Sequence, residues 1–414
     1  MKAYIINIGD ELLLGDTVNT NGSWMASVMD SVGFEVIQIK IIGDEEEEIV
    51  MAIDEAFLRA EIILITGGLG PTHDDITKHT LCKYFNDVLI KDNDVLKDVE
   101  TILSHFGKKI NEINMKQAMV PSKCEIVRNK RGTAPGMIFR KKEKIIISMP
   151  GVPHEMKSMM ENDILPMIRK NAHGSIRLHK YLKTFGIAEA NLVEILHKVI
   201  ENMNQVVKLA FLPSAGQVKL RLTATGKSEL ELKKILEREE QLFIENLGTY
   251  LYGFSKDSMA SVLGELLIEK GKTVATAESC TGGTLASKIT SIPGSSAYYI
   301  GSVITYTNKL KIQELNISES MLKEHGAVSE PVVIRMAEAI REKFGTDIGL
   351  STSGIAGPDG GTNKKPVGTI WIGMSFKNRT KAIKIKLNYN RKVNIDLTSD
   401  HAMNLLRLEL QGKV

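Results

Sequence analysis

Short apolar runs alternate with amphipathic stretches over the first part of the chain. The runs at residues 3–8, 34–42 and 61–66 predict buried strands, and the stretches between them have the apolar period of helices. Acidic residues crowd the start of the stretch 44–60, where a helix dipole favours negative charge. Strands that alternate with helices predict a parallel sheet covered by helices on both faces.

The pattern changes after about residue 165. Residues 217–226 alternate apolar and polar side chains, as in a strand with one solvated face, and residues 228–248 form a charged amphipathic helix pattern. From about residue 255 strand and helix signals alternate again. We therefore expect an α/β protein in which a small α+β module joins two α/β domains with mostly parallel sheets. The expected domains are residues 1–165, 166–252 and 253–414.

Composition narrows the class of protein. The 414 residues are 43% hydrophobic and 25% charged, as in globular proteins, and the net charge of +3 is small for this length. Such a charge does not support a dedicated nucleic-acid or membrane binder. Three cysteines far apart in sequence indicate neither a disulfide framework nor a metal site. No signal peptide or membrane-spanning run is recognisable, so we expect a cytoplasmic protein.

A glycine-rich loop follows the third apolar run. In TGGLGPTHDDIT, residues 66–77, Gly67, Gly68 and Gly70 allow a tight turn that approaches a ligand closely. Backbone N–H groups in such a loop suit a phosphate. The loop is not a Walker A motif, because no Gly-Lys-Ser/Thr follows the glycines.

Acidic residues in this loop and in two others are candidate ligands for a divalent metal. Asp74 and Asp75 follow the glycines, Asp10 follows the first strand, and Glu155 follows a later strand. Hard cations of the Mg²⁺ class prefer oxygen ligands and bridge to phosphates. Loops of this kind gather at the carboxyl ends of the strands of an open α/β sheet. Alternatively, the glycines only form turns and the acids only cap helices.

Small polar residues also gather in TAESCTGG, residues 276–283, between a predicted strand and a predicted helix. Ser279 is presented at this turn, where the N–H groups of Thr281, Gly282 and Gly283 suit an oxyanion. A serine nucleophile needs a base, and no histidine is near in sequence. A lysine whose pKa is lowered by burial can take that role.

Two later strand ends supply candidate partners for this serine. TYTNKLK contains Tyr306 and Lys311, and STSGIAGPDGG contains Ser353 and Gly354 at a second turn where a ligand can dock. Alternatively, Ser279 is only a helix cap, and the tyrosine and lysine are ordinary surface residues.

Together and in order, these motifs resemble the CinA family of bacterial competence/damage-inducible proteins over essentially the whole chain. GDELLLGDTVNTN, TGGLGPTHDDIT, GTAPGM and PGVPHEM resemble the N-terminal domain of that family, which is similar to molybdopterin-binding domains. AESCTGG, YTNKLK and SGIAGPDGG resemble its C-terminal domain.

The resemblance implies two hydrolytic activities. The C-terminal domain would deamidate nicotinamide mononucleotide to nicotinic acid mononucleotide in pyridine nucleotide salvage, without a cofactor. Ser279 would be its nucleophile, Tyr306 and Lys311 the activating partners, and Arg391 a basic residue near the substrate phosphate. The N-terminal domain would act as an ADP-ribose pyrophosphatase that depends on a divalent metal of the Mg, Mn or Co class.

The resemblance also implies a KH-like middle module and a homodimer. Two alternatives stay open for the N-terminal domain: it binds a pterin or nucleotide without turnover, or it serves a regulatory, competence-related role. The small net charge and the lack of a GxxG loop in the middle module argue against direct nucleic-acid binding.

Overall fold

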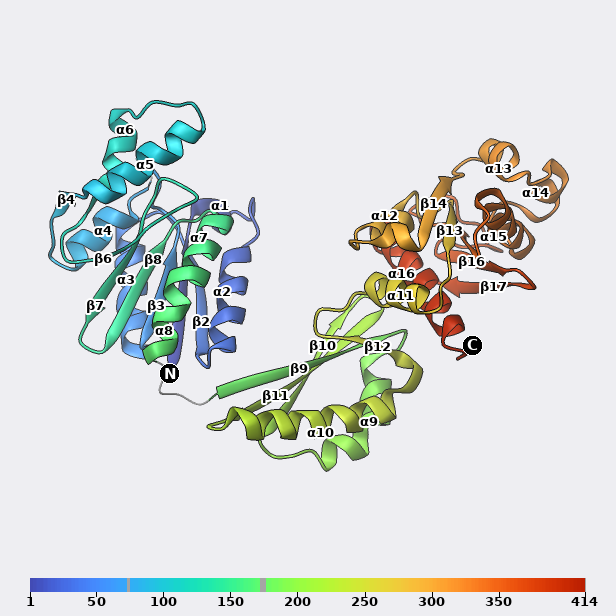
Figure 1. The fold of residues 1–414 in the computed structure, drawn as a ribbon, viewed down its shortest axis with the longest axis horizontal. Helices are drawn as coiled ribbons and strands as arrows, with labels where there is room; N and C mark the ends of the chain where they lie inside the picture. Colours follow the sequence, from blue (N-terminus) through green and yellow to red (C-terminus); the bar gives the residue numbers. More distant parts are fainter. Residues whose placement is uncertain (73–74, 172–175, 414) are drawn as a thin grey trace. The chain divides into compact units, whose positions relative to one another are not determined.

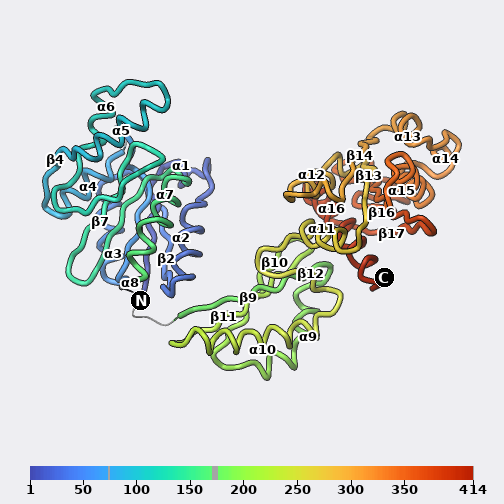
Figure 2. The backbone as a smooth tube through the Cα atoms, in the orientation of Figure 1, coloured from blue at the N-terminus to red at the C-terminus, as the bar shows by residue number. Residues whose placement is uncertain are grey.

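Two compact units make up the chain (Figure 1). The computed structural model describes residues 1–72, 75–171 and 176–413. The first unit comprises residues 1–178 with 225–232, and the second comprises residues 179–224 with 233–414. Figure 2 traces the chain through both by colour.

A six-stranded sheet with strand order β2-β1-β3-β8-β7-β6 forms the centre of the first unit. Neighbouring strands are parallel from β2 to β8, whereas β8, β7 and β6 are antiparallel. The unit also contains β4 and β5, which lie outside this sheet. The strands of the unit are β1 (Lys2–Ile8), β2 (Glu35–Ile42), β3 (Ile62–Thr66), β4 (Leu89–Lys91), β5 (Met119–Pro121), β6 (Glu125–Val127), β7 (Gly136–Lys141) and β8 (Lys144–Met149). The helices are α1 (Asp10–Leu13), α2 (Thr20–Ser31), α3 (Glu46–Arg59), α4 (Thr77–Tyr84), α5 (Asn93–His105), α6 (Glu112–Met115), η1 (Lys116–Ala118), α7 (Pro153–Met159), η2 (Met160–Ile164) and α8 (Leu165–Asn171).

Helices cover both faces of this sheet. Met25 of α2 and Met156 of α7 pack with Ile5 on one face, whereas Ile53 of α3 packs with Ile6 on the other. Successive residues of a strand point to opposite faces, which is why Ile5 and Ile6 belong to different cores. The carboxyl ends of β1, β3 and β8 therefore meet at one edge between the two helical layers.

The C-terminal part of the second unit has a five-stranded sheet with strand order β14-β13-β15-β16-β17. Helices α11, α12 and α16 cover one face, and α13, α14 and α15 cover the other. The strands are β13 (Val274–Glu278), β14 (Tyr299–Ile304), β15 (Ile348–Gly354), β16 (Thr369–Phe376) and β17 (Arg379–Lys386). The helices are α11 (Met259–Glu269), α12 (Thr284–Thr290), η4 (Ser295–Ala297), α13 (Asn308–Leu315), α14 (Glu319–His325), α15 (Glu330–Phe344) and α16 (Arg391–Leu410).

A small four-stranded sheet with order β10-β11-β9-β12 forms the middle module. The elements of the module are β9 (Ile176–Phe185), α9 (Glu189–Glu201), β10 (Val207–Ser214), β11 (Gln217–Gly226), α10 (Glu229–Leu247), η3 (Gly248–Tyr250) and β12 (Leu251–Phe254). Buried Arg407 of α16 donates to Thr249 O at 2.8 Å and to Leu251 O at 3.2 Å. These bonds tie β12 to the C-terminal helix within the second unit.

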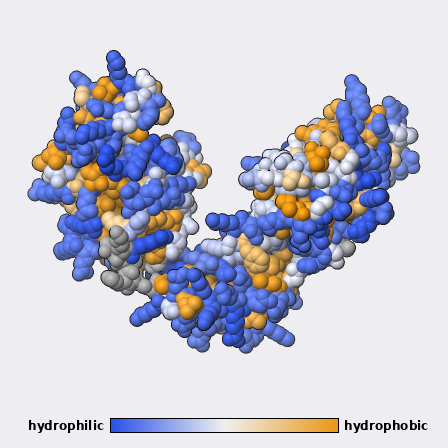
Figure 3. Space-filling view, viewed as in Figure 1, coloured by the Kyte–Doolittle hydropathy of each residue, from blue (hydrophilic) through white to orange (hydrophobic). Residues whose placement is uncertain are grey.

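The predicted fold class of two α/β domains and a small α+β module is confirmed. Both large sheets are mixed, because the β7–β8 and β16–β17 connections are short hairpins that force antiparallel pairing. Among the described residues, no helix is long and apolar enough to cross a membrane. On the face drawn in Figure 3, apolar residues lie in small groups among polar ones.

Side-chain caps set several helix ends. Ser258 caps α11 through a capping box, in which its side chain accepts from Ser261 N and the Ser261 side chain accepts from Ser258 N. Asn19 caps α2, where its side chain accepts from Gly22 N at 2.8 Å.

Candidate functional site

Ser279 lies directly after β13, an interior strand of the C-terminal sheet. Strand β13 is buried along its whole length between β14 and β15. The hydrogen-bond ladders continue past its end, because Ser279 N donates to Thr352 O at 3.0 Å and Thr305 N donates to Glu278 O at 2.8 Å. These two bonds hold the backbone that carries the serine hydroxyl.

The carboxylate of Glu278 holds the turn that follows Ser279. It is fully buried and accepts from the N–H groups of Gly283, Leu285 and Ala286 at 2.9, 3.1 and 2.8 Å. The first N–H groups of a helix have no partner within the helix, so this side chain supplies one. Gly283 has a φ of +99°, a conformation that glycine adopts without strain.

Lys311 reaches the Ser279 hydroxyl from α13. Its Nζ lies 3.0 Å from Ser279 Oγ and donates to Thr305 O at 2.8 Å. The lysine is 1% exposed, and burial lowers its pKa to about 8. The amine is therefore partly neutral near pH 8 and can accept a proton, while its bond to Thr305 O keeps it beside the hydroxyl.

Two backbone N–H groups next to Ser279 make no hydrogen bond within the described residues. They belong to Cys280 and Thr281. The N–H of Gly282, which the sequence analysis also proposes as an oxyanion donor, donates to Ser279 O at 3.2 Å. The Gly283 N–H is bound by the carboxylate described above. The free donors are thus those of residues 280 and 281.

Tyr306 and Arg391 meet at an exposed rim. Arg391 donates from Nη2 to Tyr306 Oη at 2.7 Å and from Nη1 to Gly357 O at 2.7 Å. Tyr306 is 54% exposed and, in the described part of the chain, makes no hydrogen bond to Ser279 or Lys311. The structure therefore joins the serine to the lysine, and the tyrosine to the arginine.

The remaining residues predicted for this site are engaged in the protein itself. Ser353 is buried and donates its hydroxyl to Ala327 O at 2.7 Å. A Cβ at Gly354 would lie 2.9 Å from the backbone oxygen of β16, so the position needs a small residue. The hydroxyls of Thr281 and Thr352 lie 2.7 Å apart. These groups brace the turns around the serine.

A cavity of about 400 Å³ lies at the carboxyl ends of the N-terminal strands. Four carboxylates line it: Glu11, Asp44, Asp75 and Glu155. Burial raises the pKa of Asp44, and the nearby charges of Asp10, Glu11 and Asp75 raise it further against a backbone hydrogen bond from Asp10. The sequence analysis missed Asp44, although its position just after β2 is a signal for this edge of the sheet.

Of the predicted metal ligands, the structure places Asp75 and Glu155 in the wall of this cavity. Asp75 turns into its own loop, where its carboxylate accepts from Gly70 N at 2.8 Å and from Thr72 N at 3.0 Å. Asp10 is not among the residues that line the cavity, and Asp74 lies outside the described residues. In the described ranges, no three His, Cys, Asp or Glu side chains form a group that could hold an ion alone.

The glycine-rich loop passes close to the sheet. Gly67 has a φ of +111°, and a Cβ there would overlap Ile8 O, so only glycine fits against β1. Gly67 N already donates to Met149 O at 3.1 Å. The Gly68 and Leu69 N–H groups make no hydrogen bond within the described residues. They are the donors that this loop can offer to a phosphate.

Family models match three successive parts of the chain. The matches are a probable molybdopterin binding domain at residues 4–170, a damage-inducible protein CinA KH domain at 179–253 and a CinA C-terminal domain at 256–410. A CinA-like protein of Cytophaga hutchinsonii is 42% identical over 409 residues, which cover 99% of this chain and 98% of the relative. The chain belongs to the CinA family.

Another relative and one solved structure are also similar to this chain. A CinA-like protein of Flavobacterium psychrophilum is 39% identical over 412 residues, which cover 99% of each chain. A crystal structure of a competence-damaged protein (CinA) superfamily protein from Klebsiella pneumoniae is 30% identical, with a TM-score of 0.37. That match covers 37% of this chain and 96% of the other. The Ser279 turn lies in the match to the CinA C-terminal domain, and the glycine-rich loop lies in the match to the molybdopterin-binding domain.

Proposed function

We propose that the C-terminal domain of this CinA-family protein hydrolyses a carboxamide, and that its substrate is nicotinamide mononucleotide. The 3.0 Å contact between Ser279 Oγ and buried Lys311 Nζ carries this proposal. Amide hydrolysis needs a nucleophile, a proton acceptor and oxyanion donors. The serine, the lysine and the free N–H groups of Cys280 and Thr281 fill these roles.

The proposed reaction passes all protons through one amine. Neutral Lys311 accepts the proton of Ser279 as Oγ attacks the carboxamide carbon, and the N–H groups at 280 and 281 bind the oxyanion. The lysine then returns the proton to the leaving nitrogen, and ammonia departs from an acyl-enzyme ester. Water then attacks the ester carbon as it gives one proton to the neutral lysine. The lysine passes that proton to Ser279 Oγ as the bond between the acyl carbon and Oγ breaks, and the acid product loses its own proton to solvent as it leaves as a carboxylate.

Recognition of a phosphate would explain why the substrate is a nucleotide rather than free nicotinamide. Arg391 uses two of its N–H groups on Tyr306 and Gly357, which leaves other guanidinium donors free at the exposed rim. Guanidinium groups bind phosphate through paired hydrogen bonds. Cys280 does not compete as a nucleophile, because burial raises its pKa to about 12.

The test is release of ammonia and nicotinic acid mononucleotide from nicotinamide mononucleotide in the presence of a chelator. Wild type should turn over, and Ser279→Ala should not, although it should still bind the nucleotide in calorimetry. Ser291→Ala is the matched control, because Ser291 is an exposed serine at the end of α12 whose hydroxyl only bonds Lys288 O. Turnover by Ser279→Ala at the control rate would overturn the proposal.

A second proposed activity is hydrolysis of ADP-ribose by the N-terminal domain with a divalent metal. The supporting observation is one cavity that combines four carboxylates with the free N–H groups of Gly68 and Leu69. Mg²⁺ is commonly bound by one or two carboxylates together with substrate phosphates and water, so three protein ligands are not required. Asp44 and Glu11 would hold the ion, which would neutralise charge on the pyrophosphate.

This activity is tested by AMP release from ADP-ribose, using the full chain with Ser279→Ala so that the other site is silent. Mg²⁺ should support AMP release, and a chelator should abolish it. ADP-ribose that binds without AMP release at any metal concentration would instead favour a binding module.

A further inference from the structure

The described helices of the middle module cover only one face of its four-stranded sheet. Figure 1 shows α9 and α10 together on one side of the sheet. Lys180 of β9 points to that side, because its Nζ lies 2.8 Å from Glu240 Oε2 of α10. Its neighbour Tyr181 therefore points to the other side, and so does Lys219 of β11, whose Nζ lies 5.4 Å from the centre of the Tyr181 ring. The side that carries Tyr181 and Lys219 is the open face of the module.

Basic side chains gather on this open face. Along β11, Leu220 is fully buried, whereas Lys219 and Arg221 on either side of it are partly exposed on the open face. Lys208 of β10 joins them, because it lies opposite Thr223, two residues beyond Arg221. Strands β9 to β12 contain no Asp or Glu. The open face is therefore positively charged, although the net charge of the whole chain is only +3.

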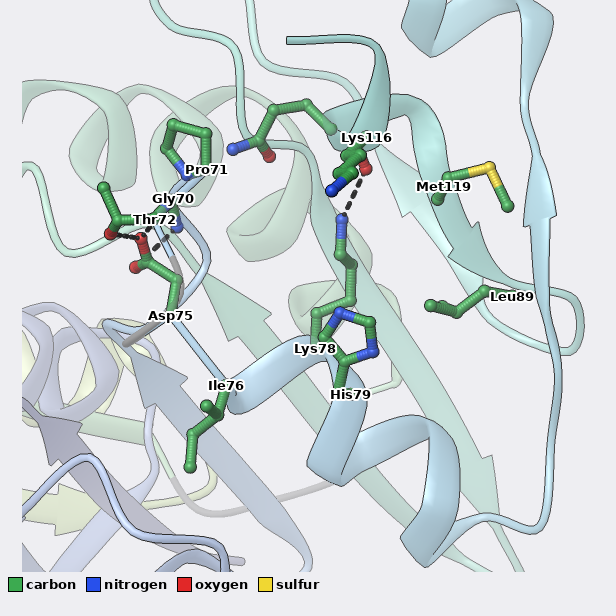
Figure 4. A pocket seen from close by; sticks show the side chains of 11 residues that line it. Gly70, Pro71, Thr72, Asp75, Ile76, Lys78, His79, Leu89, Lys116 and Met119 are labelled. Atoms are coloured by element: carbon green, nitrogen blue, oxygen red, sulfur yellow. Dashed lines mark hydrogen bonds between the residues drawn. The ribbon is translucent and has the colours of Figure 1, made fainter. Parts of the chain in front are cut away.

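The cations in the middle of the open face have no acceptor in the protein. Neither Lys219 nor Arg221 makes a hydrogen bond or an ion pair with another described residue. Lys78 of α4 is a contrasting case, because its Nζ donates to Lys116 O at 2.9 Å (Figure 4). The N–H groups of the first two side chains are thus available to a ligand.

The two ends of the open face are engaged in the protein. Arg177 at one end lies 2.7 Å from Asp30 of α2, and Lys183 at the other end donates to Asp257 O. Burial lowers the pKa of Lys183, and the charge of Lys219 lowers it further against the opposing charge of Asp257. An anion bound beside Lys219 would offset the repulsion between these two lysines.

A polyanion that also carries flat rings suits this arrangement. Lysine and arginine bind phosphates, and an aromatic side chain on an open sheet stacks on unpaired bases. A duplex keeps its bases stacked on one another, so the ring of Tyr181 would gain nothing from it. The module has no GxxG loop, through which KH domains clamp a nucleic-acid backbone, so a nucleic acid has to use another surface.

We propose that the open face of the middle module binds single-stranded nucleic acid. Tyr181 stacks on one base, Lys219 turns from the tyrosine ring to a phosphate, and Arg221 and Lys208 bind further phosphates across β11 and β10. The contact covers about two or three nucleotides, as on other four-stranded sheets that bind RNA. This site is independent of both proposed hydrolytic activities.

The experiment is fluorescence anisotropy on the full chain, with labelled oligouridylate, oligothymidylate, a duplex of the same length and polyglutamate as probes. The single strands should bind at least about tenfold more tightly than the duplex. Their affinity should fall with salt at a logarithmic slope of about −2, as expected for three cations on phosphates. Lys219→Gln with Arg221→Gln should weaken binding about tenfold and bring the slope to about −0.7. Tyr181→Leu should weaken binding by a similar factor without changing the slope, because it removes stacking and no charge.

The matched control removes the same charges from the covered side of the module. Lys234→Gln with Arg238→Gln, at two exposed positions of α10, should bind as wild type does. The exchange Lys219→Arg with Arg221→Lys keeps the charge of the open face and should also keep the affinity, which separates lost charge from lost structure. Failure of both single strands to bind at low salt would overturn the proposal. Equal affinity for the duplex or for polyglutamate, or equal weakening in the α10 control, would overturn it as well.

Discussion

Arg391 and Tyr306, 85 positions apart in sequence, are joined by a 2.7 Å hydrogen bond from Nη2 to the phenol oxygen. The same guanidinium donates to Gly357 O, so one side chain links three loops at the rim of the site. A guanidinium has five N–H groups, and this network uses two of them. The remaining N–H groups can donate to water or to a bound anion. The arginine is therefore the best candidate for a residue that binds the substrate phosphate.

Replacing this arginine should weaken substrate binding more than turnover. In Arg391→Lys, the KM for nicotinamide mononucleotide should rise about 10- to 100-fold with little change in kcat, because lysine cannot make paired bonds to phosphate. Steady-state ammonia release measures both constants. An unchanged KM would contradict a phosphate contact.

Tyr306→Phe distinguishes a rim residue from a proton relay. Because the tyrosine bonds the arginine and not the serine or lysine, we expect kcat to change by less than about threefold. A fall of about 100-fold or more, like that expected of a general base, would assign proton transfer to the phenol. Single-turnover measurements of acyl-enzyme formation would show which step is slowed.

The proposed deamidation should become faster as the pH rises. Lys311 must be unprotonated to accept a proton, and burial brings its pKa down to about 8. The value of kcat/KM should therefore rise about tenfold per pH unit below 8 and level off above it. Lys311→Arg should be inactive over the whole range, because a guanidinium keeps its proton. A profile that falls with rising pH through this range would contradict the lysine base.

The strands of the fold could be predicted because their signals are local. The apolar runs 3–8, 34–42 and 61–66 correspond to β1, β2 and β3, since a buried strand needs only its own side chains to be apolar. The turn that carries Ser279 was also predictable, since its small residues lie between a strand and a helix. Lys311 was named as a candidate base, but its contact with Ser279 could not be predicted, because the distance depends on how α13 packs against the turn after β13.

Glu278 and Asp44 could not be assigned from the sequence for a different reason. Glu278 binds N–H groups five, seven and eight residues later, so its role exists only once α12 has formed. Asp44 begins an acidic run that a helix dipole explains equally well.

A carboxylate at position 44 should matter for metal affinity rather than for folding. Asp44→Asn should lower the affinity for Mn²⁺ in the presence of ADP-ribose by about tenfold, as electron paramagnetic resonance of free Mn²⁺ can measure. The metal-free variant should be no less stable, because a partly buried charge beside other carboxylates is removed. Asp16→Asn, an exposed position in the loop after α1, is the control and should bind Mn²⁺ as wild type does.

Glu278 should control both the stability of the domain and the activity of the serine. In Glu278→Gln, an amide NH₂ replaces one carboxylate oxygen and faces N–H groups of α12, so at least one buried donor loses its acceptor. The free energy of unfolding should fall by about 1–3 kcal/mol in urea titrations. The kcat of the proposed deamidation should fall as well, because the turn that positions Ser279 is held less firmly.

The control for Glu278→Gln is Glu319→Gln on exposed helix α14. Glu319 makes a surface ion pair with Lys323 at 3.7 Å, and such pairs contribute less than about 0.5 kcal/mol. This variant should match wild type in unfolding and in turnover. If Glu278→Gln also matched wild type in both measurements, the carboxylate would not hold the turn. If Glu278→Gln lost stability but kept the full kcat, the carboxylate would only stabilise helix α12. The position of Ser279 would then depend on the backbone bonds of β13 to its two neighbouring strands.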